Sequence, residues 1–175
     1  MTSRSVTAHR THAASASRRA VSVRQATEDD LDAVVELRLA LLREYGSHPI
    51  YGRLRADAPP RARRLFLAQL RADREVTLLA ERHDRVIGIL RCLESVGMPL
   101  LHPDRYTYVA SVYVVPDERR SGVLRALFEA AVHWSRERGI DEMRLHNTAD
   151  NAAANGAWEA LGFEVVEHLR VKNLR

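Results

Sequence analysis

The sequence has a single cysteine, Cys92, so it can form no internal disulfide, and nothing in its cysteine use indicates an oxidising compartment. It also lacks long hydrophobic runs: stretches such as Val112 to Val115 are far shorter than the ~20 residues that a membrane-spanning helix needs. Its eight histidines show no H-x-x-x-H spacing, so no metal site is predicted. These absences predict a cytoplasmic protein without a membrane partner.

Acidic residues are absent from the first 24 positions, where five arginines contribute to a formal net charge of +4. Residues 1–20 are rich in Ser, Thr, Ala and Arg and cannot bury enough apolar surface to offset the entropy of ordering. We therefore predict a disordered basic tail over 1–20 and one folded domain over 21–175. The tail's composition is also that of an organelle transit peptide, although an untargeted tail is the simpler interpretation.

Hydrophobic periodicity along residues 21–175 predicts an α/β domain in which strands and helices pack in layers. The strands are expected over 21–25, 76–80, 86–93, 106–115, 143–147 and 163–171. The helices are expected over about 31–45, 62–71, 120–138 and 151–161, with Pro59 and Pro60 interrupting the chain before the second.

The segment from Val112 to Arg125 carries the most chemical information. A buried strand stops at Pro116, and a basic turn containing Gly122 opens the next helix. Unpaired N–H groups and the positive end of a helix dipole suit a phosphate, and nearby arginines add charged donors. The segment therefore indicates a diphosphate site, with an ordinary strand–helix junction bearing solvated arginines as the equally weighted alternative.

Two motifs in this order resemble the GNAT superfamily of acetyl-CoA-dependent N-acetyltransferases. The first, V-x-P-x-x-[RQ]-x-x-G-x-[GA], is matched by Val114, Pro116, Arg119 and Gly122. The second, N-x-x-A-x-x-x-[YW]-x-x-x-G-F, is matched by Asn151, Ala154, Trp158, Gly162 and Phe163. The resemblance covers about residues 21–171 and implies a mixed central sheet of about six to seven strands flanked by about four helices.

The resemblance implies acetyl-CoA as co-substrate and assigns its contacts. Main-chain groups of Val112, Tyr113 and Val114 would pair with the pantetheine arm, and the Asn151 side chain would help to hold the cofactor. The diphosphate would lie on the turn and the first helical residues, which are Arg119, Arg120, Ser121, Gly122, Val123, Leu124 and Arg125. The thioester would lie where the fourth and fifth strands splay apart.

Two positions depart from the family pattern. Leu124 stands where Gly or Ala is usual, so its side chain must turn toward the core if the amides are to reach a phosphate. Trp158 stands where many members carry a tyrosine that protonates the leaving thiolate, and an indole N–H is not a useful acid. Tyr113 is an alternative proton donor.

Acetylation of an amine needs a general base that takes up the amine's proton. In several members of the family this base is a glutamate five residues before the motif asparagine, and His146 occupies that position here. An imidazole titrates near pH ~6.5 and can serve as such a base. The alternative is a histidine that only hydrogen-bonds a neighbouring loop, and Glu94 and Asp150 are secondary candidates for the base.

The predicted function is transfer of an acetyl group to a primary amine of a small molecule or a protein. The acceptor site is expected between the first two helices and the loop 95–106, with Tyr45, His48 and Tyr51 opposite that loop. A non-catalytic acetyl-CoA sensor is the main alternative, and nucleic-acid binding through the basic tail ranks last. A homodimer is expected from the resemblance alone.

Three further residues are predicted to serve packing rather than chemistry. Cys92 lies in an apolar strand without a sequence-adjacent activating base. Trp134 and Trp158 fall on apolar faces of predicted helices.

Overall fold

The structure is a computed structural model that describes residues 20–174. The predicted basic tail lies outside the described residues, apart from Ala20. Within the described part of the chain, no helix is long and apolar enough to cross a membrane.

Apart from the final predicted strand, the elements follow one another as the hydrophobic pattern predicts, with differences at their ends. The strands are β1 (Ser22–Gln25), β2 (Glu75–Arg82), β3 (Arg85–Val96), β4 (Arg105–Val114) and β5 (Met143–Leu145). The helices are α2 (Leu31–Glu44), α3 (Ala58–Leu70), α4 (Val123–Glu137) and α5 (Ala152–Ala160), with short 3-10 turns η1 (Glu28–Asp30) and η2 (Pro116–Glu118).

The second long helix begins earlier than the sequence indicated, because α3 includes Pro59 and Pro60 in its first turn. Proline is tolerated there since the first N–H groups of a helix have no intrahelical acceptor. The two prolines therefore start this helix rather than interrupting the chain before it.

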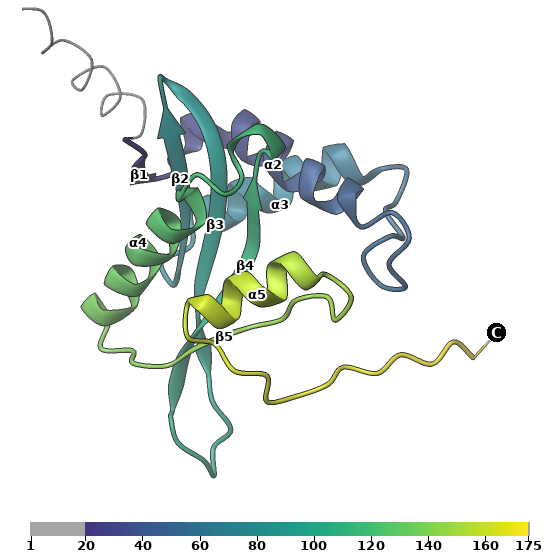
Figure 1. The fold of residues 1–175 in the computed structure, drawn as a ribbon, viewed down its shortest axis with the longest axis vertical. Coiled ribbons are helices and arrows are strands. Elements are labelled where there is room, and N and C mark those ends of the chain that lie inside the picture. The colour runs from purple at the N-terminus through teal and green to yellow at the C-terminus, as the bar shows by residue number, and fades with distance from the viewer. Residues whose placement is uncertain (1–19, 175) are drawn as a thin grey trace, which may run out of the picture.

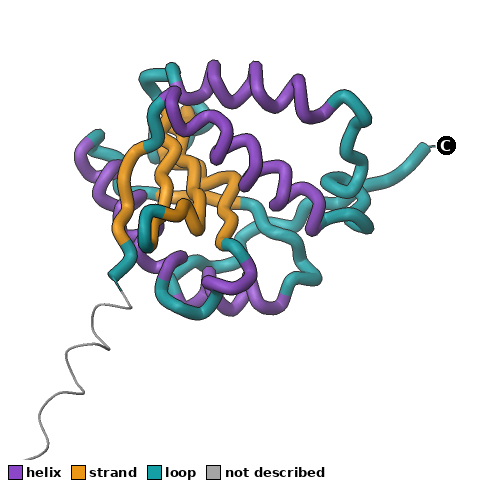
Figure 2. The backbone as a smooth tube through the Cα atoms, turned by 90° about the horizontal axis from the view of Figure 1, so that it is seen from above, coloured by secondary structure: helices purple, strands orange, loops and turns teal. Residues whose placement is uncertain are grey.

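The five strands form one sheet in the order β1-β2-β3-β4-β5. The first four are antiparallel neighbours, and β5 lies parallel to β4, so the sheet is mixed. Helices cover both faces, with α4 and α5 on one and α2 and α3 on the other (Figures 1 and 2). This arrangement confirms the predicted α/β fold class.

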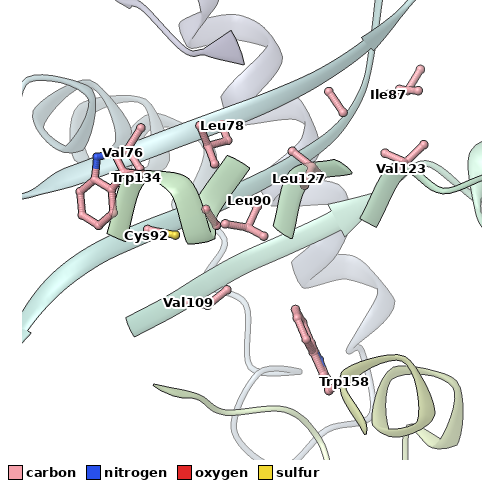
Figure 3. Close-up of a cluster of buried hydrophobic side chains, with 12 residues drawn as sticks. Val76, Leu78, Ile87, Leu90, Cys92, Val109, Val123, Leu127, Trp134 and Trp158 are labelled. Atoms are coloured by element: carbon pink, nitrogen blue, oxygen red, sulfur yellow. The ribbon is translucent and has the colours of Figure 1, made fainter. Parts of the chain in front are cut away.

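Two hydrophobic clusters, one on each face, hold these layers together. The first packs α4 against the sheet, and Figure 3 shows Leu127 of α4 and Leu90 of β3 within it. Cys92, Trp134 and Trp158 belong to the same cluster, with Cys92 fully buried, as the sequence predicts. The second cluster packs Phe66 and other residues of α2 and α3 on the opposite face.

The strand expected over 163–171 is absent, and so the sheet has five strands rather than six or seven. After α5 the chain runs away from the sheet (Figure 1), and its apolar side chains Val165, Val166 and Leu169 are exposed. Alternation alone does not make a strand, because a strand also needs a hydrogen-bonding partner along its length.

An ion-pair network fastens β1 to the start of α2. Arg24 donates hydrogen bonds to both carboxylate oxygens of Asp30, each at 2.7 Å, and pairs with Glu81 of β2. Asp30 also accepts a hydrogen bond from the main-chain N–H of Thr27 at 2.8 Å. The hydrogen bonds from Arg24 hold the pKa of Asp30 down at about 2.

We expect Asp30→Asn to lower the free energy of unfolding at pH 7 by about 1 kcal/mol, the usual size for a cap combined with a surface ion pair. Because the folded pKa lies below the unfolded value of about 3.9, this stabilisation is complete above pH ~4 and is lost as the pH falls toward 2. Urea unfolding of both proteins at pH 7 and pH 2.5 measures the difference. Asp29→Asn, which changes an exposed acid in the same turn, is the control. An equal loss of stability in Asp30→Asn at both pH values would contradict the electrostatic explanation.

Candidate active site

The parallel pairing between β4 and β5 is short. It covers only Thr107 to Val109 of β4, opposite Met143 to Leu145. Beyond Val109, β4 continues to Val114 with β3 on one side and no paired strand on the other. The main chain of this β4 edge, residues 110–114, is therefore available to another extended group, and it includes the predicted pantetheine contacts.

A β-bulge falls within the free edge. Ala110 pairs with Arg91 and Tyr113 with Ile89, so two β4 residues lie opposite one residue of β3. Ser111 has a φ of 53° there, in the left-handed region. Such bulges bend a strand and re-aim its side chains, here just beyond the last pair with β5.

The turn after β4 presents main-chain donors. No N–H group from residue 120 to residue 125 has a hydrogen-bond partner among residues 20–174. Arg120 and Gly122 have φ values of 61° and 88°, and a Cβ built on Gly122 would meet no atom within 4 Å. Successive N–H groups at such a turn and at a helix start form an anion-binding arrangement.

Side chains of other elements fix this turn. Arg82 of β2 forms an ion pair with Glu118 and is mostly buried, with 11% of its side chain exposed. The hydroxyl of Ser121 donates to the Glu118 main-chain oxygen at 2.7 Å and accepts from Arg82 at 3.4 Å. Sequence reasoning missed this role of Arg82, which lies more than thirty positions before its partners.

The predicted phosphate-binding arginines divide into two groups. Arg119 donates to the main-chain oxygen of Val114 at 3.0 Å and to Glu44 of α2 at 2.5 Å, so its guanidinium is engaged within the protein. Arg120 and Arg125 are exposed on the surface of the turn. These two side chains are therefore the ones free to approach an anion.

The turn accommodates Leu124, which stands where the family pattern has Gly or Ala. Val123 is buried at 1% exposure, and Leu124 packs against the same hydrophobic cluster. Leu124 thus meets the condition that its side chain turns toward the core. Asn151 is the N-cap of α5, where its Oδ1 accepts a hydrogen bond from the Ala154 N–H at 3.0 Å.

His146 follows the last residue of β5 directly and forms a close pair with a β4 residue. Its Nδ1 lies 2.7 Å from the Tyr108 hydroxyl, and the two ring centroids are 5.6 Å apart. Burial raises the pKa of Tyr108, and the nearby Tyr51 adds to that rise. No sequence pattern indicates Tyr108, because its contact with His146 depends on the register of the β4–β5 pair.

The other candidate acids and bases lie elsewhere. Tyr113 is 8% exposed and belongs to the cluster on the α2 and α3 face, where burial raises its pKa. Glu94 pairs with Arg105 at 3.0 Å, and that hydrogen bond lowers the pKa of Glu94. Asp150 is exposed just before α5. Trp158 packs edge-to-face on Phe163, with centroids 5.4 Å apart, and so serves the core.

Three aromatic side chains gather in the segment between α2 and α3. The rings of His48 and Tyr51 stack with centroids 4.8 Å apart, and Tyr45 lies 5.6 Å from Tyr51. Tyr51 of this cluster also contributes to the raised pKa of Tyr108. By contrast, the tip of the β3–β4 hairpin projects away from it (Figure 1), with Leu100 89% exposed.

A hollow of about 430 Å³ lies at the opposite end of β4 and shares no residue with the His146 pair. It is lined mainly by polar residues, namely Pro103, Asp104, Arg105, Gly139, Asp141 and Glu142. Among residues 20–174, no group of three or more His, Cys, Asp or Glu side chains is placed to hold a metal ion.

The sequence matches a known protein family. The sequence model of the "Acetyltransferase (GNAT) family" matches residues 36–163. An aminoglycoside N(6')-acetyltransferase type 1 of Stenotrophomonas maltophilia is 33% identical over 86% of this chain and 90% of its own length. A protein of the same name from Klebsiella aerogenes is 45% identical, but the match covers 33% of this chain and only 38% of that protein. N-alpha-acetyltransferase 30 of Schizosaccharomyces pombe is 32% identical over 51% of this chain and 57% of its own length.

Solved structures share the fold. The crystal structure of a predicted acetyltransferase with acetyl-CoA from Clostridium acetobutylicum superposes with a TM-score of 0.72. The match covers 89% of this chain and 97% of that one at 20% sequence identity, which shows the fold alone.

Cys92 is predicted to serve packing rather than chemistry, and the reactivity of its thiol tests that prediction. Burial raises the pKa of its thiol to about 12, and the residue is 0% exposed. We therefore expect no alkylation by iodoacetamide at pH 8 in the folded protein and complete alkylation in 6 M guanidinium, measured by mass spectrometry. Rapid modification of the folded protein would mean that Cys92 is accessible and reactive.

Proposed function

Because the chain belongs to the GNAT family of acetyltransferases, we propose that it is an N-acetyltransferase that moves an acetyl group from acetyl-CoA to a primary amine. The observation that carries the proposal is the position of His146. It lies at the end of β5, where the free edge of β4 begins, and bonds to Tyr108. A titratable imidazole thus adjoins the part of the sheet on which the family resemblance places the thioester.

The residues of the turn fit acetyl-CoA. Six consecutive N–H groups, those of residues 120–125, face no acceptor among residues 20–174, and the exposed guanidiniums of Arg120 and Arg125 add positive charge. A diphosphate needs this combination of main-chain donors and cations. The β4 edge at Val112, Tyr113 and Val114, where the Val114 oxygen already accepts from Arg119, would pair with the amide groups of the pantetheine arm. When bound, acetyl-CoA supplies an activated acetyl carbonyl.

His146 would serve as the general base. The attacking amine must lose a proton as its nitrogen bonds to the carbonyl carbon, and a positioned imidazole accelerates such steps by about 10²–10⁴-fold. Asp150 is exposed and Glu94 is held by Arg105, so neither offers an equally placed base.

The acceptor would approach across the Tyr45, His48 and Tyr51 cluster, on the face covered by α2. One relative's name refers to the N(6') position of an aminoglycoside, and another's name refers to an N-alpha position. A primary amine is the group that the site is proposed to take. A non-catalytic sensor would bind acetyl-CoA equally well, so turnover is the observation that separates the two functions.

Acetyl-CoA binding tests the turn. We expect Gly122→Trp to abolish the binding measured by calorimetry, because the indole would occupy the space in front of the free N–H groups. Gly139→Trp is the matched control, since Gly139 follows the C-cap of α4 with a φ of 65° and an equally open Cβ direction. The two variants carry similar backbone strain, so only the first should lose binding. Equal loss of binding in both, or none in either, would contradict this cofactor site.

Turnover tests the base. We expect His146→Ala to lower kcat by about 100-fold or more against the best amine of a panel, with unchanged affinity for acetyl-CoA. The control is His133→Ala, because His133 is an exposed histidine on the surface of α4. Full activity of His146→Ala would remove His146 from the mechanism. Tight binding of acetyl-CoA by the parent protein, without turnover of any amine, would favour the sensor.

A further inference from the structure

We propose that Tyr108 is the group that takes the proton from the acceptor amine, while passing its own hydroxyl proton to His146. The inference rests on the proposed acetyltransferase function and adds a catalytic residue to it. In this scheme His146 does not contact the amine directly. It receives a proton from the Tyr108 hydroxyl as Tyr108 takes the proton of the amine.

The first argument is the direction of the hydrogen bond between Tyr108 and His146. A phenol is a stronger donor than a neutral imidazole N–H, so at 2.7 Å the favoured arrangement has the Tyr108 O–H donating to Nδ1. The Tyr108 hydroxyl thus directs its hydrogen to the ring of His146.

This arrangement fixes which imidazole nitrogen can act as a base. With Nδ1 accepting from Tyr108, a neutral His146 carries its hydrogen on Nε2, which therefore has no lone pair to offer an amine. The remaining lone pair, on Nδ1, is covered by the Tyr108 hydroxyl. A proton from the amine can then reach His146 only through the tyrosine oxygen.

The second argument is the position of Tyr108 on β4. Its neighbours Thr107 and Val109 point to the other face, where Thr107 bonds to Ser135 of α4 at 2.7 Å. Tyr108 therefore faces the opposite side of the sheet, which α2 and α3 cover. On that side its hydroxyl is in hydrogen-bonding contact with the imidazole of His146.

The step balances. The amine nitrogen forms a bond to the acetyl carbon, the carbon–sulfur bond breaks, and the sulfur leaves with the electron pair as thiolate. The amine proton moves to the Tyr108 oxygen as the Tyr108 proton moves to His146 Nδ1. After the products leave, the imidazolium passes its Nδ1 proton back to the Tyr108 oxygen as the Tyr108 hydroxyl releases its proton to water, which restores the neutral Nε2–H form. No oxidant, metal or further reactant is needed.

The tautomer of His146 in the free protein is a test that needs no substrate. In ¹⁵N-labelled protein above pH 8, long-range ¹H–¹⁵N spectra distinguish the two neutral forms, and the signal of His146 is assigned by its loss in His146→Ala. We expect the Nε2–H form in the parent protein and a mixture of both forms in Tyr108→Phe. An Nδ1–H form in the parent would overturn the relay, because His146 would then present a free Nε2 lone pair.

Turnover provides the second test. Tyr108→Phe keeps the ring and removes only the hydroxyl, and we expect kcat to fall by about 100-fold with KM changed less than about threefold. The double variant with His146→Ala should be no slower than either single variant, because both groups serve one proton transfer. The matched control is Tyr106→Phe, two residues earlier on the same face of β4.

The outcomes separate this inference from the function on which it rests. A Tyr108→Phe variant that retains turnover while His146→Ala loses it would overturn the relay and leave the acetyltransferase intact. Multiplicative losses in the double variant would likewise show two independent roles. If the parent protein binds no acetyl-CoA and acetylates no amine, both the function and the relay fail.

Discussion

The candidate site depends on the early separation of β4 from β5. Three residue pairs join the two strands, and β4 then continues for five residues with one edge free. A strand edge without a partner presents unpaired N–H and C=O groups, which soluble proteins usually cover or shorten. Here the separation leaves a main-chain surface for an extended ligand and places His146 beside it. A longer β5 would pair with that surface and close it.

Side chains of β2 and α2 contact the turn that follows β4. Arg82 of β2 fixes it through Glu118 and Ser121, and Arg119 connects it to Val114 and to Glu44 of α2. Main-chain donors can stabilise a phosphate without a reorganisation cost only if such contacts fix their directions beforehand. Since Glu44 lies at the end of α2, the same contacts link the turn to the helix that borders the aromatic cluster.

The two departures from the family pattern have different consequences. Leu124 packs against the hydrophobic core, so its larger side chain does not obstruct the main-chain N–H groups of the turn. Trp158 also packs in the core, against Phe163. No tyrosine therefore stands at the position where many family members carry one. A phenol does lie near the site, but it comes from β4. Function in a shared fold thus depends on which strand supplies a group, as well as on whether the fold is present.

The sequence alone determined the fold class, the burial of Trp134 and Cys92, and the turn with Gly122 at the start of α4, because each depends on local periodicity or on residues adjacent in the chain. It predicted His146 as a candidate but did not identify Tyr108, which lies 38 positions away. It also predicted a final strand that the structure lacks. Only the tertiary structure decided which strands pair, in which register they pair, and where the bulge at Ser111 falls. These features depend on which strands meet and where their pairing stops, and no local pattern encodes that.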